Sequence, residues 1–182
     1  MPFRKHLKSR YPAANVPRRN EPVAMDYVIS DTPAYRSGVT KAAFFEGRES
    51  HVMDAYPIRS EKQAPKVTED NIRQRGAPTK LISDNAKSNV SQRMKDLLRL
   101  FHIQDYQSEP HNQQQNFAEN GIGKAKNVTN RVMDRTGCPA SYWLLCLLWV
   151  ITVMNYTAAP SLDWKIPLTV LTGSTTDISI LL

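Results

Sequence analysis

Residues 23–29 read VAMDYVI, and two more β-favouring segments follow, KAAFFEGRE at residues 41–49 and HVMDAYPI at residues 51–58. Turn-forming residues, SDTPAYRSG, separate the first segment from the second. The second and third segments join near Gly47 so closely that an antiparallel hairpin is the natural connection. The three segments therefore predict a three-stranded meander whose first strand carries Asp26.

The rest of the chain alternates between helical and strand patterns. We expect helices over residues 61–75, 90–101, 118–135 and 140–156, and strands over residues 79–83, the run TKLIS before Asp84, and 103–108. The apolar positions of the second helix, which Ser88 or Ser91 could cap, are spaced as one helical face: Val90, Met94, Leu97, Leu98 and Phe101. Five strands with interspersed helices indicate an α/β fold.

Charge and length suggest one domain with tails. The chain has 182 residues and a formal net charge of +7. The first twenty residues contain six basic side chains and no acidic one, so we interpret residues 1–20 as a basic extended arm or linker. We expect the core to span residues 21–160 and residues 161–182 to form a C-terminal extension.

Several classes of protein are disfavoured. The two cysteines, Cys138 and Cys146, have no partner pattern for a zinc site, so we predict no zinc and a reduced setting inside the cell. No apolar segment of the kind that follows a signal peptide's basic start is present, so secretion is not expected. The apolar run at residues 143–154 is too short to cross a bilayer comfortably, and we predict a buried helix with no membrane partner.

Three carboxylates stand out by position. Asp26 lies within one predicted strand, Asp84 ends another, and Glu119 lies on a predicted helix. If these elements are neighbours, the three groups converge, and oxygen ligands of that kind suit Mg²⁺ or Mn²⁺. Asp31 and Asp54 are competing candidates for the first carboxylate, although Asp31 lies in a turn-like segment where aspartate commonly bonds the backbone.

The helix at residues 118–135 carries basic side chains at two positions around its axis. Glu119 and Lys126 lie together at the edge of the apolar face, where Lys126 could contact DNA next to a scissile phosphate. Lys124, Arg131 and Arg135 form a separate ridge on the opposite side, suited to phosphate contacts. The alternative for all four is a solvated helix face.

Two longer motifs carry a resemblance to a known family. LISDNAKSN at residues 81–89 and YQSEPHNQQQNFAENGIGKAKN at residues 106–127 resemble the second and third signature blocks of integrases of copia-type LTR retrotransposons. The segment from residue 23 to 63 is similar to the first block of a subgroup abundant in diatoms and related algae. The similarity covers roughly residues 16 to 180.

The resemblance implies a ribonuclease H-like fold, a mixed five-stranded sheet with flanking helices. It implies processing of the 3′ ends of retroelement DNA and strand transfer into host DNA, with two Mg²⁺ or Mn²⁺ ions. Asp26, Asp84 and Glu119 would be the catalytic metal ligands, and Asn85 and Asn116 would order the loops. Homo-oligomers bound to element-end and target DNA, in the nucleus and in a cytoplasmic retroelement particle, are the expected setting.

Some features depart from the family pattern. The zinc-binding module that precedes the core in family integrases is not recognisable, Asn120 stands where relatives often have Arg, and Ala86 replaces a common Gly. Two rival hypotheses therefore stay open. One is a catalytically inactive nucleic-acid-binding remnant of a retrotransposon polyprotein, and the other is a non-catalytic oligomerisation domain built on the helix at residues 140–156.

Overall fold

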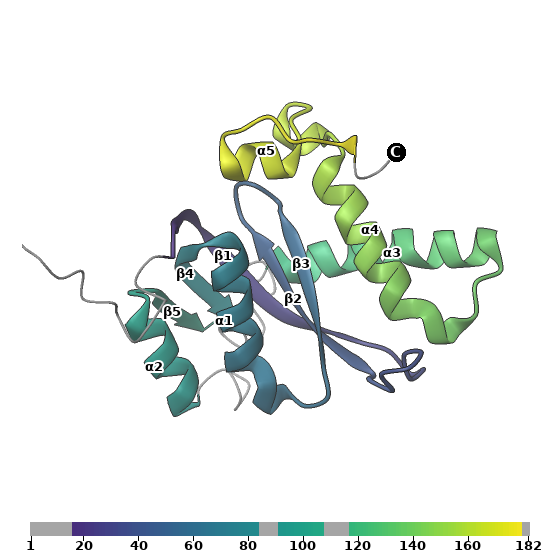
Figure 1. Cartoon of the computed structure of the whole chain (residues 1–182), viewed down its shortest axis with the longest axis horizontal. Coiled ribbons are helices and arrows are strands. Elements are labelled where there is room, and N and C mark those ends of the chain that lie inside the picture. Colours follow the sequence, from purple (N-terminus) through teal and green to yellow (C-terminus); the bar gives the residue numbers. More distant parts are fainter. Residues whose placement is uncertain (1–15, 84–90, 108–116, 180–182) are drawn as a thin grey trace, which may run out of the picture.

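The computed structural model describes residues 16–83, 91–107 and 117–179. A five-stranded mixed sheet forms the centre, in the order β3-β2-β1-β4-β5 (Figure 1). The strands are β1 (Arg18–Ile29), β2 (Lys41–Gly47), β3 (Met53–Ile58), β4 (Ala77–Ser83) and β5 (Gln104–Gln107). β2 is antiparallel to both of its neighbours, β1 and β3, as the meander predicted, whereas β4 and β5 run parallel to β1.

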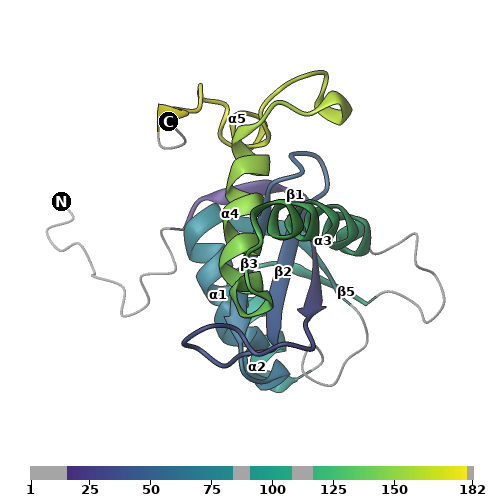
Figure 2. The same ribbon diagram turned by 90° about the vertical axis from the view of Figure 1, so that its right-hand side faces the viewer.

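Helices cover both faces of the sheet. Successive side chains of a strand point to opposite faces, so each strand contributes apolar residues to both. On β1, Val23 and Met25 face one core, with side chains from α1 (Ala64–Arg75) and α2 (Gln92–Leu100). Ala24 and Val28 face the other core, with side chains from α3 (Phe117–Thr136) and α4 (Trp143–Tyr156). In Figure 2, α3 and α4 lie on the side of the sheet that faces the viewer. The result is a three-layer α/β/α arrangement.

Local signals explain most helix ends. α2 begins after Ser91, whose hydroxyl accepts from the backbone N–H of Met94 at 3.3 Å, so the second of the two predicted caps is used. Pro65 lies in the first turn of α1, where its missing N–H costs nothing. Gly76, at φ 99°, follows the last residue of α1. These positions confirm the predicted helices to within a few residues.

Two features differ from the sequence prediction. β1 begins at Arg18 rather than at Val23, since Arg18 and Arg19 already pair with Ala77 and Pro78 of β4. A short helix that was not predicted, α5 (Pro167–Thr172), packs near the start of β1. Residues 1–15 of the predicted arm lie outside the described residues.

Candidate active site

Asp26 lies in the middle of β1 and is half-buried. Its Oδ1 accepts a hydrogen bond from the backbone N–H of Tyr27 at 2.7 Å. Asp26 falls between Ala24 and Val28 in the alternation of the strand, so it faces the same side of the sheet as α3. Opposite it on β2 is Phe44.

The second predicted carboxylate, Asp84, lies outside the described residues, and so do the predicted loop-ordering residues Asn85 and Asn116. The strand before it is well defined. β4 ends at Ser83, and its parallel register with β1 pairs Ile82 with Ala24. The end of β4 therefore lies beside the part of β1 that carries Asp26.

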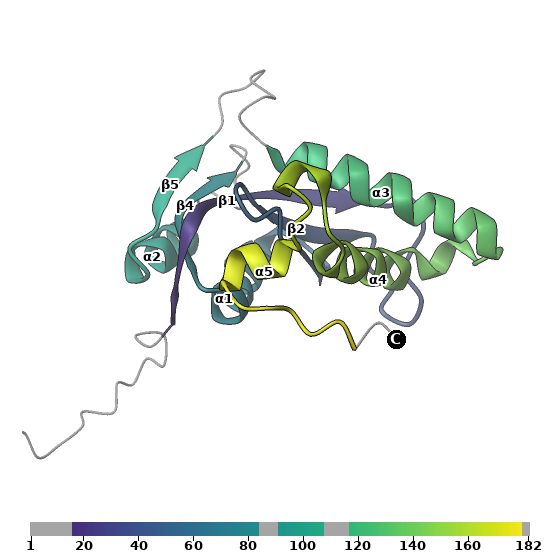
Figure 3. The same ribbon diagram turned by 90° about the horizontal axis from the view of Figure 1, so that it is seen from above.

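Glu119 is an exposed residue in the first turn of α3. Its neighbour Ala118 is fully buried in the core between α3 and the sheet, which fixes this turn against the strands. Two residues later, Gly121 lies so close to β2 that an added Cβ would be 3.2 Å from Cε1 of Phe44 and would overlap the carboxyl of Glu46. α3 thus contacts β1 and β2, and Figure 3 shows it running alongside β1.

The two competing aspartates are placed elsewhere. Asp54 is buried on β3 and accepts hydrogen bonds from Asn71 and Arg75, both on α1, so its carboxylate faces the opposite side of the sheet from α3. Asp31 is exposed in the turn after β1. Of the three candidates for the first carboxylate, only Asp26 faces α3 from within a strand.

The basic residues of α3 are all exposed, but they face different neighbours. Lys126 lines a cavity of about 250 Å³ together with the end of β1 and the turn after it, residues 28–32. Lys124 lies near enough to Glu46 of β2 to lower the pKa of that carboxyl. By helical spacing the two lysines lie at opposite edges of the buried face of α3, and Arg131 and Arg135 continue the Lys124 side.

One buried acid was not singled out from the sequence. Glu46 ends the apolar run of β2 with only 4% of its surface exposed, and its Oε2 has no hydrogen-bond partner among the described residues. Burial raises its pKa to about 7, against the opposing charge of Lys124 and with a further rise from Glu21. The available signal was alternation, because Glu46 shares the inward register of Phe44.

His51 contacts Glu46, with 3.3 Å between its Nδ1 and Oε1 of the glutamate. The geometry would fit an ion pair, but burial and Lys124 lower the pKa of the imidazole while the pKa of Glu46 is raised. Near pH 7 the imidazole is therefore mostly neutral and the carboxyl of Glu46 is about half protonated, so the contact is a hydrogen bond rather than a full ion pair.

Within the described ranges no three histidine, cysteine or acidic side chains come together as a metal site. Asp26 of β1 and Glu119 of α3 belong to elements on the same side of the sheet, and the predicted third ligand, Asp84, lies outside the described residues. No helix in the described part of the chain has the length and apolar character needed to cross a membrane.

No family model and no curated protein sequence matches this chain. Solved structures do. A chain of the simian T-cell lymphotropic virus intasome superposes with a TM-score of 0.70 at 14% identity, over 88% of this chain and 56% of that one. The chain therefore spans just over half the length of that relative.

Isolated integrase cores are matched over almost their whole length. The HTLV-2 integrase catalytic core domain, in a dimeric form with magnesium, matches with a TM-score of 0.63 and 16% identity, over 86% of this chain and 98% of that one. The BIV integrase catalytic core domain matches with a TM-score of 0.65 and 13% identity, over 85% and 95%. This chain has the ribonuclease H-like fold of retroviral integrase catalytic cores, as its sequence predicted.

Proposed function

We propose that this chain is an integrase-type polynucleotidyl transferase that processes the 3′ ends of retroelement DNA and joins them to host DNA. The observation that carries the proposal is the placement of Asp26. It faces α3 from the central strand of an integrase-core fold, beside the end of the parallel strand that precedes Asp84 in the sequence.

The position of Glu119 supports convergence on Asp26. Gly121 contacts Phe44, and Phe44 pairs with Asp26 across the sheet. Glu119 precedes Gly121 by two residues, about 3 Å along the helix axis. Around that axis Glu119 is about 140° from Lys124. Lys124 lies on the edge of α3 near β2, so Glu119 is expected on the other edge, toward β1 and β4.

The donor chemistry fits a hard divalent cation. Asp26, Asp84 and Glu119 would hold Mg²⁺ or Mn²⁺ through carboxylate oxygens, and the HTLV-2 integrase core was solved with magnesium. When bound, two such ions would activate the attacking oxygen and stabilise charge on the leaving oxygen. The protein's own part is to present Asp26 from strand β1 and Glu119 from helix α3.

Basic side chains of α3 would hold the DNA. Lys126 lies seven residues after Glu119 on the same edge of the helix, so we assign it a phosphate contact close to the reacting bond. Lys124, Arg131 and Arg135 would contact phosphates along the other edge, without reading base sequence. Binding through them should weaken steeply as salt is raised.

Substitution of the carboxylates tests the enzyme. Asp26→Asn, Asp84→Asn and Glu119→Gln should each abolish Mg²⁺-dependent or Mn²⁺-dependent nicking and strand transfer on element-end DNA while salt-sensitive DNA binding persists. Asp31→Asn, in the exposed turn, is the matched control and should keep activity. If the wild-type chain binds DNA but shows no metal-dependent activity, the inactive remnant replaces the enzyme as the conclusion.

We also propose that the chain self-associates through α4. Leu145 and Trp149 on this helix are 53% and 57% exposed, although the helix is apolar almost all round. The HTLV-2 core was solved in dimeric and trimeric forms. Trp149→Lys should shift the chain to monomer in sedimentation equilibrium, and an unchanged mass would rule this surface out.

Residues 81–89 and 106–127 resemble two signature blocks of copia-type integrases. We propose a copia-type retrotransposon as the source and a retroelement particle in nucleus and cytoplasm as the setting. Because the family's integrases act on their own element ends, the chain should prefer DNA from the termini of the element that encodes it. Equal activity on unrelated duplexes would contradict this.

A further inference from the structure

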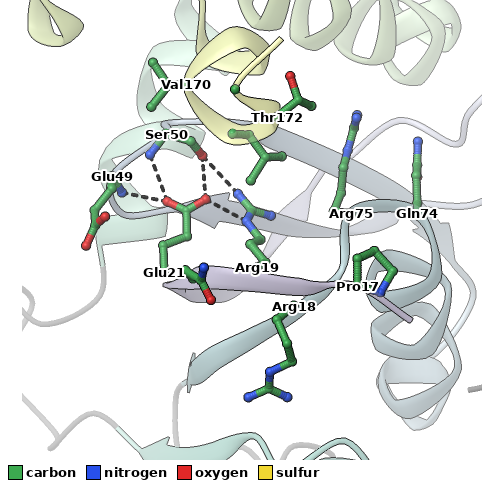
Figure 4. Close-up of a pocket in the computed structure, with 13 residues that line it drawn as sticks. Pro17, Arg18, Arg19, Glu21, Glu49, Ser50, Gln74, Arg75, Val170 and Thr172 are labelled. Carbon is green, nitrogen blue, oxygen red and sulfur yellow. Dashed lines mark hydrogen bonds and ion pairs between the residues drawn. The ribbon is translucent and has the colours of Figure 1, made fainter. Parts of the chain in front are cut away.

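A second cavity, of about 680 Å³, lies away from the face that carries Asp26 and α3. Four segments line it: the start of β1, the turn between β2 and β3, the end of α1, and the second half of α5. Figure 4 shows the labelled side chains, with Val170 and Thr172 of α5 above Arg19 and Ser50. Its volume is in the range of pockets that bind small organic ligands.

Arg19 lies at the base of this cavity and is 98% buried, with 2% of its surface exposed. Its Nε donates to Oε1 of Glu21 at 2.6 Å and its Nη2 donates to Oγ of Ser50 at 3.2 Å. Its Nη1 is also buried, yet no acceptor among the described residues bonds to it. An unsatisfied donor on a buried cation is costly, because the group has lost its hydration without gaining a partner.

Glu21 does not remain available to attract a cation. Its two oxygens accept from Arg19, from the hydroxyl and backbone N–H of Ser50, and from the backbone N–H of Glu49. Burial alone would raise the pKa of Glu21, but Arg19 and the bonds from Ser50 outweigh it and hold the pKa below its usual value. The free end of Arg19 is therefore the part of this pair with unused bonding capacity.

A second guanidinium lines the same cavity. Arg75 uses Nε and Nη2 on the carboxylate of Asp54, at 3.0 and 2.7 Å, and Asp54 itself does not line the cavity. Gln74, beside it, accepts through Oε1 from Tyr56 and so keeps its amide N–H groups as donors. The lining therefore combines the arginines Arg18, Arg19 and Arg75 with the carboxylates Glu21 and Glu49, of which Glu21 is already satisfied by its four donors.

We propose that this cavity binds a phosphate group, whose oxygens accept from Nη1 of Arg19 and lie in the positive potential of Arg75. Guanidinium donors match the spacing of phosphate oxygens and stay charged at every physiological pH. The phosphate could belong to a free nucleotide or to a nucleic-acid backbone. The inference does not depend on the proposed integrase activity, because none of its residues belongs to the carboxylate site.

The test is a thermal-unfolding titration of the full chain without divalent metal, using inorganic phosphate, adenosine monophosphate and a short DNA duplex in turn. Inorganic phosphate and the nucleotide should raise the Tm in a saturable way. Val170→Trp changes no member of the ion pairs, should narrow the cavity from the α5 side, and should abolish the rise. Arg75→Gln should weaken phosphate binding by about tenfold.

Arg73→Gln is the matched control, because Arg73 lies on the same helix, is exposed, and does not line the cavity. It should leave phosphate binding unchanged. A Tm rise that occurs only with duplex DNA and disappears in Val170→Trp would assign the site to backbone phosphate. No Tm rise with any of the three, or a rise that Val170→Trp leaves intact in a folded protein, would overturn the proposal.

Discussion

Glu21 and Glu46 are two glutamates on neighbouring strands, and each has 4% of its surface exposed. Their pKa values nevertheless shift in opposite directions. Glu21 accepts from four donors and its pKa is lowered, so it is ionised. Among the described residues the carboxyl of Glu46 has one hydrogen-bond partner, His51, and its pKa rises to about 7. The difference shows that partners rather than depth decide whether a buried carboxyl keeps its charge.

A glycine lies against each of the two glutamates, and the two glycines make room for different groups. Around Glu21 the backbone itself is adapted, since a Cβ on Gly47 would overlap Nη2 of Arg19 and lie 2.6 Å from Oε1 of Glu21. Around Glu46, Gly121 leaves space for a carboxyl without giving it a donor. One glycine therefore makes room for an ion pair and the other for a buried carboxyl with a raised pKa beneath α3.

The largest effect should come from breaking the ionised cluster. Glu21→Ala leaves Arg19 buried without its counter-charge, and we expect the free energy of unfolding to fall by about 3–5 kcal/mol. Urea denaturation at pH 7 measures it. The matched control is Glu46→Gln, measured at pH 5. Glu46 is already protonated at that pH, so the substitution should change the free energy of unfolding little. Equal losses in the two variants would contradict the comparison.

The pH dependence of stability sharpens the contrast. The pKa of Glu46 rises from 4.5 to about 7 on folding, so the folded chain binds more protons between these values and stability falls as pH rises through them. The fall attributable to Glu46 is about 3 kcal/mol. It should disappear from the urea midpoints of Glu46→Gln measured from pH 4.5 to 7.5. Glu21, whose pKa is lowered, loses its contribution only at more acidic pH.

Gly121→Ala should have an intermediate effect. The new methyl would overlap the buried Glu46 carboxyl, so we expect a loss of about 1–3 kcal/mol. Gly123→Ala, two residues on with open space around it, should instead stabilise α3 by about 0.5–1 kcal/mol. Thermal unfolding of both variants tests this, and rescue of Gly121→Ala by Glu46→Ala would identify the clash.

The smallest effect is expected for an ion pair at the surface. Arg73 donates to Glu69 one turn earlier on α1, at 2.6 Å, with half of its side chain exposed. Because water already solvates both charges, Arg73→Gln should change the free energy of unfolding by less than about 0.5 kcal/mol. A loss comparable to that of Glu21→Ala would show that burial is not the variable that separates these pairs.

The sequence predicted most of the fold because its signals are local. Strand-favouring segments and the tight join near Gly47 predicted β1 to β3. The apolar spacing of α2, and Gly76 and Pro78 after α1, predicted those two helices. It could not predict the early start of β1, because the residues before Val23 are polar and pair with β4, far away in the chain. α5 is only six residues long and carries no strong helical period.

The candidate site could be predicted only in part. Asp26 is now distinguished from Asp54 by the face of the sheet that each occupies, which no spacing rule fixes in advance. Asp26, Asp84 and Glu119 as metal ligands stay a prediction. Arg19 was interpreted as part of a basic arm, because a run of arginines near a terminus is usually solvated, whereas its burial depends on Glu21 and Ser50.

The sequence by itself determined the α/β class, the order of the elements, and the strand and helix that carry Asp26 and Glu119, because periodicity and turn residues act over a few positions. Only the tertiary structure decided which charges are buried together. A carboxyl's pKa depends on donors that come from distant segments, and here the surroundings lower the pKa of Glu21 and raise that of Glu46 to about 7.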